Sequence, residues 1–179
     1  MTALNVDPRY PIGKFEPQPY SDILRGERIL DIKFLPNDLE VTIQSLDESQ
    51  LATPYRDGGW TVQQLVHHIA DSHMNAYVRF KWALTEELST IKTYKEKEWA
   101  ELPDVFHVPI NVSVTLLHAL HRRWVALLNT ITEDQWNNVK IFHPERQVEM
   151  SLWTLLGIYA WHSKHHVAHI NKLKEQKGW

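Results

Sequence analysis

Four segments of this sequence carry apolar residues at the three- and four-residue spacing of an α-helix. They span residues 21–46, 61–87, 113–129 and 151–176. This spacing gathers the apolar side chains of each helix on one stripe, which has to be buried against neighbouring helices. Four long amphipathic helices joined by loops predict an all-α fold, a four-helix bundle.

Start and stop signals support these helices. Thr61 lies three residues before Gln64, which is the spacing of a capping box. Ser151 is a suitable N-cap for the last helix, and Gly178 stands just beyond its expected end. Within the first segment, Pro36 predicts a kink or a break, because proline lacks the N–H that a helix interior uses.

The connections between the expected helices differ in length. Residues 88–112 contain two prolines and little periodicity. A link of this length allows the second and third helices to run parallel. Thr132 and Gln135 repeat the capping-box spacing and predict one short extra turn of helix. Residues 139–150 predict two short strands, which would form a β-hairpin.

Composition limits the class of protein. A length of 179 residues favours a single domain over 1–179, with the proline-rich residues 1–20 as an extended arm. The net charge of −3 argues against binding to nucleic acid or to an anionic membrane. The chain has no cysteine, so it has neither disulfides nor thiolate metal ligands. No signal peptide or membrane-spanning run is indicated, and a cytoplasmic protein is expected.

Histidines are concentrated in the last expected helix, where residues 161–170 read WHSKHHVAHI. His162 and His166 are four residues apart, so their side chains lie one above the other on one helix face. This face lies at or beside the apolar stripe. Two imidazoles at this spacing can bind one metal ion.

A third ligand would complete such a site, because a catalytic metal usually has three protein ligands and one open position. The second helix contains LVHHIADSH, with candidates His67, His68 and His73. His73 is on the apolar stripe, whereas His67 and His68 fall on its opposite flanks, so helical phase does not choose between these two. Asp71 is the candidate catalytic carboxylate, or an acceptor that orients a ligand ring.

A simpler interpretation applies to several histidines. Isolated histidines on apolar faces are usually hydrogen-bonded core residues, and His73, His118 and His121 fit this description. His165 and His169 are expected at the surface or in support of the ligands. If every histidine had such a role, the chain would be a purely structural bundle without a metal.

Longer motifs resemble a known family. GGWTVQQLVHHIADSHMNAYVRFKWALTE, FHPE, YAWHSKHHVAHI, YPIGKFEP and TPYRDGGW resemble the DinB-like superfamily and, within it, the YfiT branch. That branch is described both as metal-dependent hydrolases and as bacillithiol S-transferases. The resemblance implies a four-helix bundle with up-down-down-up connectivity, and it covers nearly the whole chain.

The resemblance also implies a site. His162 and His166 match the family's ligand pair in the last helix, and His68 matches its third ligand, with His67 as the fallback. One divalent ion per chain is implied, zinc or nickel, although three imidazoles suit cobalt and ferrous iron as well. A small-molecule substrate and a homodimer are expected.

Three functions remain open at this point. A hydrolase would use the metal to activate water. A thiol S-transferase would use it to hold a low-molecular-weight thiol, of the bacillithiol type, as the thiolate. Since the chain has no cysteine, that thiol would have to come from a small molecule. A non-catalytic metal-binding bundle of the stress-response kind is the third alternative.

Overall fold

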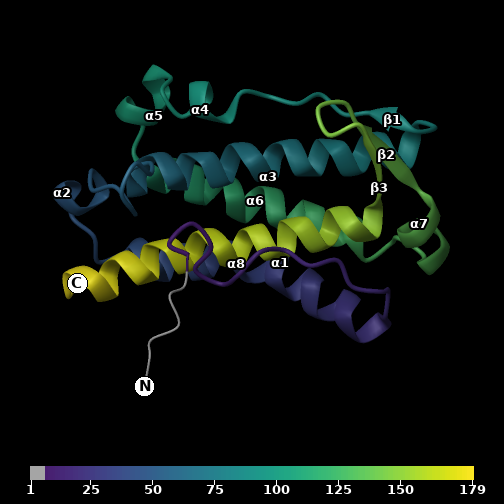
Figure 1. The fold of residues 1–179 in the computed structure, drawn as a ribbon, viewed down its shortest axis with the longest axis horizontal. Helices are drawn as coiled ribbons and strands as arrows, with labels where there is room; N and C mark the ends of the chain where they lie inside the picture. Colours follow the sequence, from purple (N-terminus) through teal and green to yellow (C-terminus); the bar gives the residue numbers. More distant parts are fainter. Residues whose placement is uncertain (1–6) are drawn as a thin grey trace.

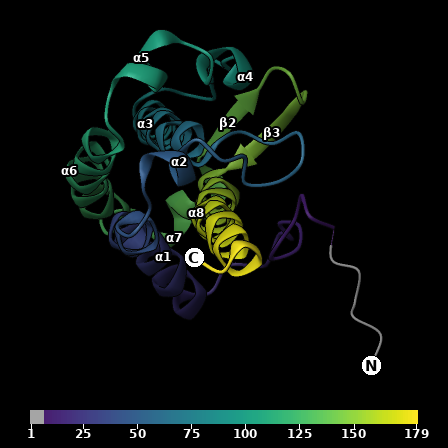
Figure 2. The same cartoon turned by 90° about the vertical axis from the view of Figure 1, so that its left-hand side faces the viewer.

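The computed structural model describes residues 7–179, and four long helices dominate it (Figure 1). The long helices are α1 (Asp22–Ile43), α3 (Val62–Thr85), α6 (Ile110–Leu128) and α8 (Leu152–Lys177). Both α1 and α3 pack against α6 and α8, so α1 and α3 lie diagonally opposite each other, as the end-on view shows (Figure 2). The predicted four-helix bundle is confirmed.

The helices run in the expected directions. In Figure 1, α1 and α8 run one way along the bundle, and α3 and α6 run the other way. The long link between α3 and α6 returns along the bundle and contains β1 (Ser89–Thr90), α4 (Glu96–Trp99) and α5 (Pro103–His107). This crossover makes α3 and α6 parallel and gives the up-down-down-up connectivity.

A small sheet lies at the end of the bundle where α3 and α6 finish (Figure 1). The strands β2 (Lys140–His143) and β3 (Val148–Ser151) form the predicted antiparallel hairpin. The sequence did not indicate β1, which pairs in parallel with β2. Its two residues are too few to show a period.

The capping signals act as predicted. The Thr61 capping box starts α3, and the Thr132 box starts α7 (Glu133–Asn138). Ser151 caps α8, which ends at Gly178 with a φ of 70°. One short helix, α2 (Glu48–Leu51), joins α1 to α3. The helix α6 starts at Ile110, three residues before the predicted start, and Pro109 occupies its N-cap position.

The predicted break at Pro36 is wrong, because α1 continues through this residue as one helix. Leu35 and Leu39, on either side, are fully buried in the bundle and hold the backbone in place. Pro36 removes one backbone hydrogen bond, the one that the carbonyl of Ile32 would accept. That carbonyl accepts a hydrogen bond from His121 Nδ1 instead.

The apolar core has two parts with a layer of histidines between them. One part surrounds the buried rings of Phe80, Trp124 and Trp136, and the other surrounds Leu35 and Leu65. On α8, the four histidines fall between Tyr159 of the first cluster and Ile170 of the second, and on α3 His73 falls between Ala70 and Ala76. The bundle therefore places its polar centre midway along its length.

The described part of the N-terminal arm lies on α8. Trp153 Nε1 donates a hydrogen bond of 2.7 Å to the Gln18 carbonyl, and Trp161 Nε1 donates one of 3.1 Å to the Gly13 carbonyl. Residues 1–6 of the expected arm lie outside the described residues. Within residues 7–179, none of the helices combines the length and the apolar character that crossing a membrane requires.

Candidate metal centre

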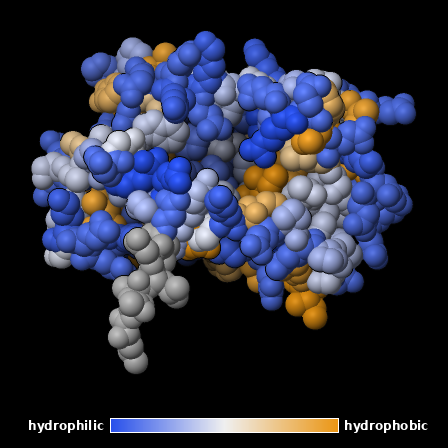
Figure 3. Space-filling view, in the orientation of Figure 1, coloured by the Kyte–Doolittle hydropathy of each residue, from blue (hydrophilic) through white to orange (hydrophobic). Residues whose placement is uncertain are grey.

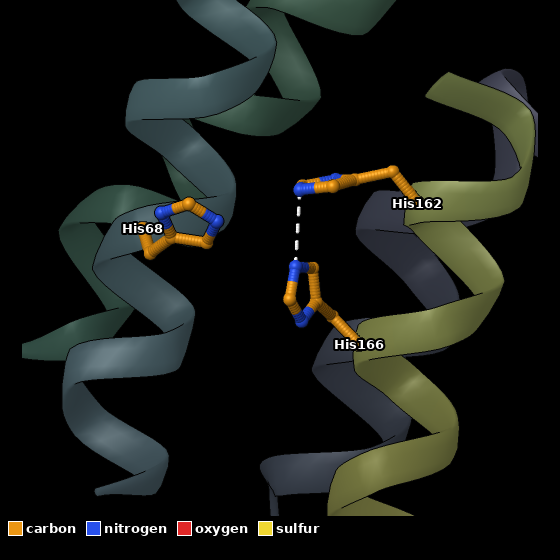
Figure 4. Close-up of side chains that lie close together, drawn as sticks. All are labelled: His68, His162 and His166. Atoms are coloured by element: carbon orange, nitrogen blue, oxygen red, sulfur yellow. Dashed lines mark hydrogen bonds between the residues drawn. The ribbon is translucent and has the colours of Figure 1, made fainter. Parts of the chain in front are cut away.

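Three histidines converge between α3 and α8 (Figure 4). His68 projects from α3, and His162 and His166 project from successive turns of α8. Each offers one ligand atom, and these atoms all lie within 4.8 Å of one another. Nε2 of His162 and Nε2 of His166 are 3.0 Å apart. Among residues 7–179, this is the one cluster of at least three such side chains with metal-binding spacing.

Burial keeps these imidazoles neutral. It lowers the pKa of His68 to about 4, and it lowers the pKa of His166 and His162 well below the ordinary value. Proximity of the rings to one another acts in the same direction for His162 and His166. Neutral rings have one nitrogen lone pair each, which is what a metal ligand requires. The donor set therefore fits one divalent cation.

The structure shows that His67 and His68 face different helices. His67 faces α6, where its Nδ1 lies 2.8 Å from Ser113 Oγ and its Nε2 lies 3.1 Å from the Val108 carbonyl oxygen. Both of its ring nitrogens therefore have hydrogen-bond partners. His68 faces α8 and packs against the ring of Trp60, with the ring centroids 4.6 Å apart. The cluster therefore contains His68 and not the fallback His67.

Two other histidines are hydrogen-bonded core residues, as the simpler interpretation predicted. His73 is fully buried, and His121 is 2% exposed. His73 Nε2 lies 3.2 Å from His162 Nδ1, and His73 Nδ1 lies 3.0 Å from His121 Nε2. His118, in contrast, is largely at the surface, where its Nε2 lies 3.1 Å from Glu40 Oε2.

His165 and His169 were expected at the surface or in support of the ligands, and the first alternative is wrong, because both are buried. Their Nε2 atoms are 3.2 Å apart, so they form a second pair on α8. The ring of His165 stacks on Trp161, and that of His169 packs on Tyr55. The arm and the residues before α3 cover this side of α8, which its own periodicity could not indicate.

Asp71 lies on α3 one turn after His68. Burial raises the pKa of its carboxyl to about 6. Within the described residues, the side chain of Asp71 makes no hydrogen bond to any of the three clustered histidines, and it does not line the adjacent cavity.

A cavity of about 700 Å³ opens onto the three histidines. Figure 3 shows this face of the molecule hollowed, with mainly hydrophilic side chains around the hollow. His68, His162 and His166 line the cavity from α3 and α8, and residues of the crossover and of the hairpin turn line its other sides. A ligand in the cavity therefore reaches all three imidazoles.

Sequence reasoning missed two residues in this cavity. Arg79 Nη1 donates a hydrogen bond of 2.7 Å to the hydroxyl of Tyr159, and Arg79 Nη2 donates one of 3.3 Å to the Lys92 carbonyl. The sequence did contain a signal for both residues. Arg79 follows His68 by eleven residues, which is close to three helical turns, so the two side chains share a face of α3. Tyr159 lies three residues before His162, so these two side chains share a face of α8.

Comparison with known proteins identifies relatives over nearly the whole chain. A model of the DinB superfamily matches residues 32–170. Proteins from Bacillus cereus and from Bacillus thuringiensis subsp. konkukian, each named "Putative metal-dependent hydrolase", are 48% identical over 174 residues. The matches cover 97% of this chain and 99% of theirs.

A solved structure agrees with this relationship. YfiT from Bacillus subtilis, described as "a probable metal-dependent hydrolase with an unusual four-helix bundle topology", superposes with a TM-score of 0.94 at 45% identity. The match covers 97% of this chain and 99% of that one. On these similarities of sequence and fold, the chain belongs to the DinB superfamily, in the branch that includes YfiT.

Proposed function

We propose that this chain is a metal-dependent hydrolase, with one divalent ion, zinc or nickel, held by His68, His162 and His166. The observation that carries the proposal is three neutral imidazoles whose ligand atoms converge at a cavity. Such an ion would supply Lewis acidity and would lower the pKa of a water molecule to about 7. The names of the Bacillus relatives and of YfiT support the same class of enzyme.

The charge of the protein ligands matters for this chemistry. Three uncharged imidazoles leave the full charge of the ion in the site, which favours an anionic nucleophile beside it. Trp60 packs on His68, so it excludes water from one side of that ring and limits how the ring can turn. His68, His162 and His166 come from two long helices, which hold them more rigidly than loops would.

Arg79 is the proposed binding group for negative charge on the substrate. Its guanidinium group lines the cavity and is oriented by Tyr159 and by the Lys92 carbonyl. A fixed cation beside the reacting group stabilises negative charge that develops in the transition state of hydrolysis. Three glutamates also line the cavity, whereas Asp71 does not, so the proton acceptor is sought among these residues: Glu96, Glu98 and Glu145.

Metal analysis of the purified full-length protein, prepared without a histidine tag, tests the site. The wild type is expected to contain about one zinc or nickel per chain. His68→Ala and His162→Ala are expected to lose it. The matched control is His67→Gln, which changes the adjacent histidine and is expected to keep the metal. A wild-type protein that contains no metal, and binds neither ion on titration, would refute the proposal.

Activity of the same samples distinguishes the alternatives. Hydrolysis of a panel of esters, amides and phosphate esters is expected with the metal-loaded protein and not after chelation. If an electrophile reacts only when a small-molecule thiol is added, and the thiol is found in the product, the protein is a thiol S-transferase. A loaded protein without either activity would favour the non-catalytic alternative. The homodimer and the cytoplasmic location remain predictions, and sedimentation analysis tests the first.

A further inference from the structure

A chain of hydrogen bonds leads from the candidate metal centre through the core to the opposite side of the bundle. His162 Nδ1 lies 3.2 Å from His73 Nε2, and His73 Nδ1 lies 3.0 Å from His121 Nε2. His121 Nδ1 then contacts the carbonyl oxygen of Ile32. These four residues belong to α8, α3, α6 and α1, so the chain connects all four long helices.

The chain ends at a group that can only accept a hydrogen bond. A backbone carbonyl has no proton to donate, so the proton of His121 has to be on Nδ1. Because a neutral imidazole carries one proton, Nε2 of His121 is then an acceptor, and His73 donates to it from Nδ1. By the same reasoning, Nε2 of His73 accepts a hydrogen bond that His162 donates from its own Nδ1.

The argument requires neutral rings, and the surroundings provide them. His73 is fully buried and His121 is 2% exposed, and an unpaired charge in such a position is strongly unfavourable. Neither ring is bonded to a carboxylate within the described residues. Burial lowers the pKa of His121 to about 4.

Pro36 explains why the carbonyl of Ile32 is available. In a regular α-helix, the carbonyl of residue 32 would accept from the N–H of residue 36, four positions later. Proline has no N–H, so this carbonyl lacks its regular partner within the helix. A side chain on a neighbouring helix, His121, takes the place of the missing donor.

We propose that Ile32, His121 and His73 fix the tautomer of His162, so that its Nε2 presents a lone pair to the metal. This inference rests on the proposed metal site and makes His73 and His121 positioning residues, not ligands. A hydrogen bond at one ring nitrogen determines which nitrogen is free to bind a metal, and it also orients the ring. His166 lacks such support, since its Nδ1 has no hydrogen-bond partner within residues 7–179.

Nitrogen NMR of the metal-free wild type tests the tautomers directly. Long-range proton–nitrogen spectra distinguish a ring nitrogen that carries a proton from one that does not, and single variants assign the signals. His121, His73 and His162 are expected to carry the proton on Nδ1. A proton on Nε2 of His162 would overturn the proposal. This readout needs neither bound metal nor a substrate.

Zinc affinity, measured by competition with a chelator, tests the consequence. His121→Leu removes both hydrogen bonds of the ring and is expected to weaken zinc binding about 10- to 100-fold. His121→Gln is expected to keep most of the affinity, because its amide can donate to Ile32 and accept from His73. His118→Gln changes a partly exposed histidine on the same helix, outside these hydrogen bonds, and serves as the control, with unchanged affinity.

The outcomes separate this inference from the proposed function. A folded His121→Leu protein that binds zinc as tightly as the wild type would overturn the inference. If this variant does not fold, the tautomers in the wild type decide, supporting the inference with Nδ1–H at His162 and overturning it with Nε2–H. If the wild type binds no zinc at all, the proposed function fails. The positioning role of His73 and His121 then fails with it, whichever tautomers are found.

Discussion

A single methyl group tests how the N-terminal arm is held against the bundle. At Gly157 of α8, a Cβ atom would lie 2.9 Å from Arg28 Nη1 and 3.0 Å from Phe15 Cε2 of the arm. Arg28 is buried and cannot easily move, because its guanidinium group stacks 3.9 Å above the ring of Trp153. We therefore expect Gly157→Ala to push the arm or the guanidinium group away from α8.

Gly26 provides a matched control. It also lies inside a long helix, but a Cβ there would meet nothing within 4 Å. Replacing a helical glycine by alanine stabilises by about 1 kcal/mol, so Gly26→Ala should raise the melting temperature. At Gly157 the same gain is opposed by overpacking of about 1–3 kcal/mol.

The difference in the free energy of unfolding between Gly26→Ala and Gly157→Ala isolates the steric effect, because the gain in helix propensity is the same in both. This difference should amount to about 1–3 kcal/mol. For a chain of this size that corresponds to a melting temperature about 2–12 °C lower for Gly157→Ala than for Gly26→Ala. Thermal unfolding followed by circular dichroism measures it. If both substitutions raised the melting temperature equally, Phe15 and Arg28 would not pack on Gly157 as described.

Three further predictions concern the site. Zinc at about 1,000 times its Kd should stabilise the wild type by about 4 kcal/mol, which is a rise in melting temperature of about 8–16 °C. His162→Ala should show no such rise. A wild type whose melting temperature does not rise with zinc would contradict the metal site. Burial raises the pKa of the Asp71 carboxyl to about 6, above its ordinary 3.8. The folded state therefore binds the carboxyl proton more tightly than the unfolded state does, and the contribution of Asp71 to the free energy of unfolding falls as the pH rises from about 4 through 6. In urea denaturation, Asp71→Asn should therefore be more stable than the wild type at about pH 8, by no more than about 1 kcal/mol because the carboxyl is partly exposed, and an equal advantage at about pH 4 would refute the shift. Arg79→Met should lower kcat/KM about 10- to 100-fold, the equivalent of a lost hydrogen bond to a charged group, with the metal content unchanged; an unaltered kcat/KM would remove Arg79 from the substrate site.

Much of the fold could be predicted locally. The period of the apolar residues is a property of each helix by itself, and it predicted all four long helices. Capping boxes involve residues only three positions apart, so Thr61 and Thr132 were recognised as helix starts. The spacing of His162 and His166 is also local, and it was enough to predict that their side chains meet.

The tertiary structure decided the questions that depend on neighbouring helices. Helical phase left His67 and His68 equivalent, and they became different only because α6 packs on one flank of α3 and α8 on the other. The same holds for Pro36, which local rules treat as a helix breaker. In the bundle, His121 supplies the hydrogen bond that the proline cannot make.

By itself, therefore, the sequence determined which residues form helices and which side chains share a helix face. Contacts between residues far apart in the chain determined which face meets which neighbour: His121 is 89 positions from Ile32, and His162 is 89 positions from His73. Such contacts depend on how four helices pack together, and a pattern within one helix carries no information about them. The cluster of His68, His162 and His166 and the hydrogen bonds that reach it from His73 and His121 arise at that level.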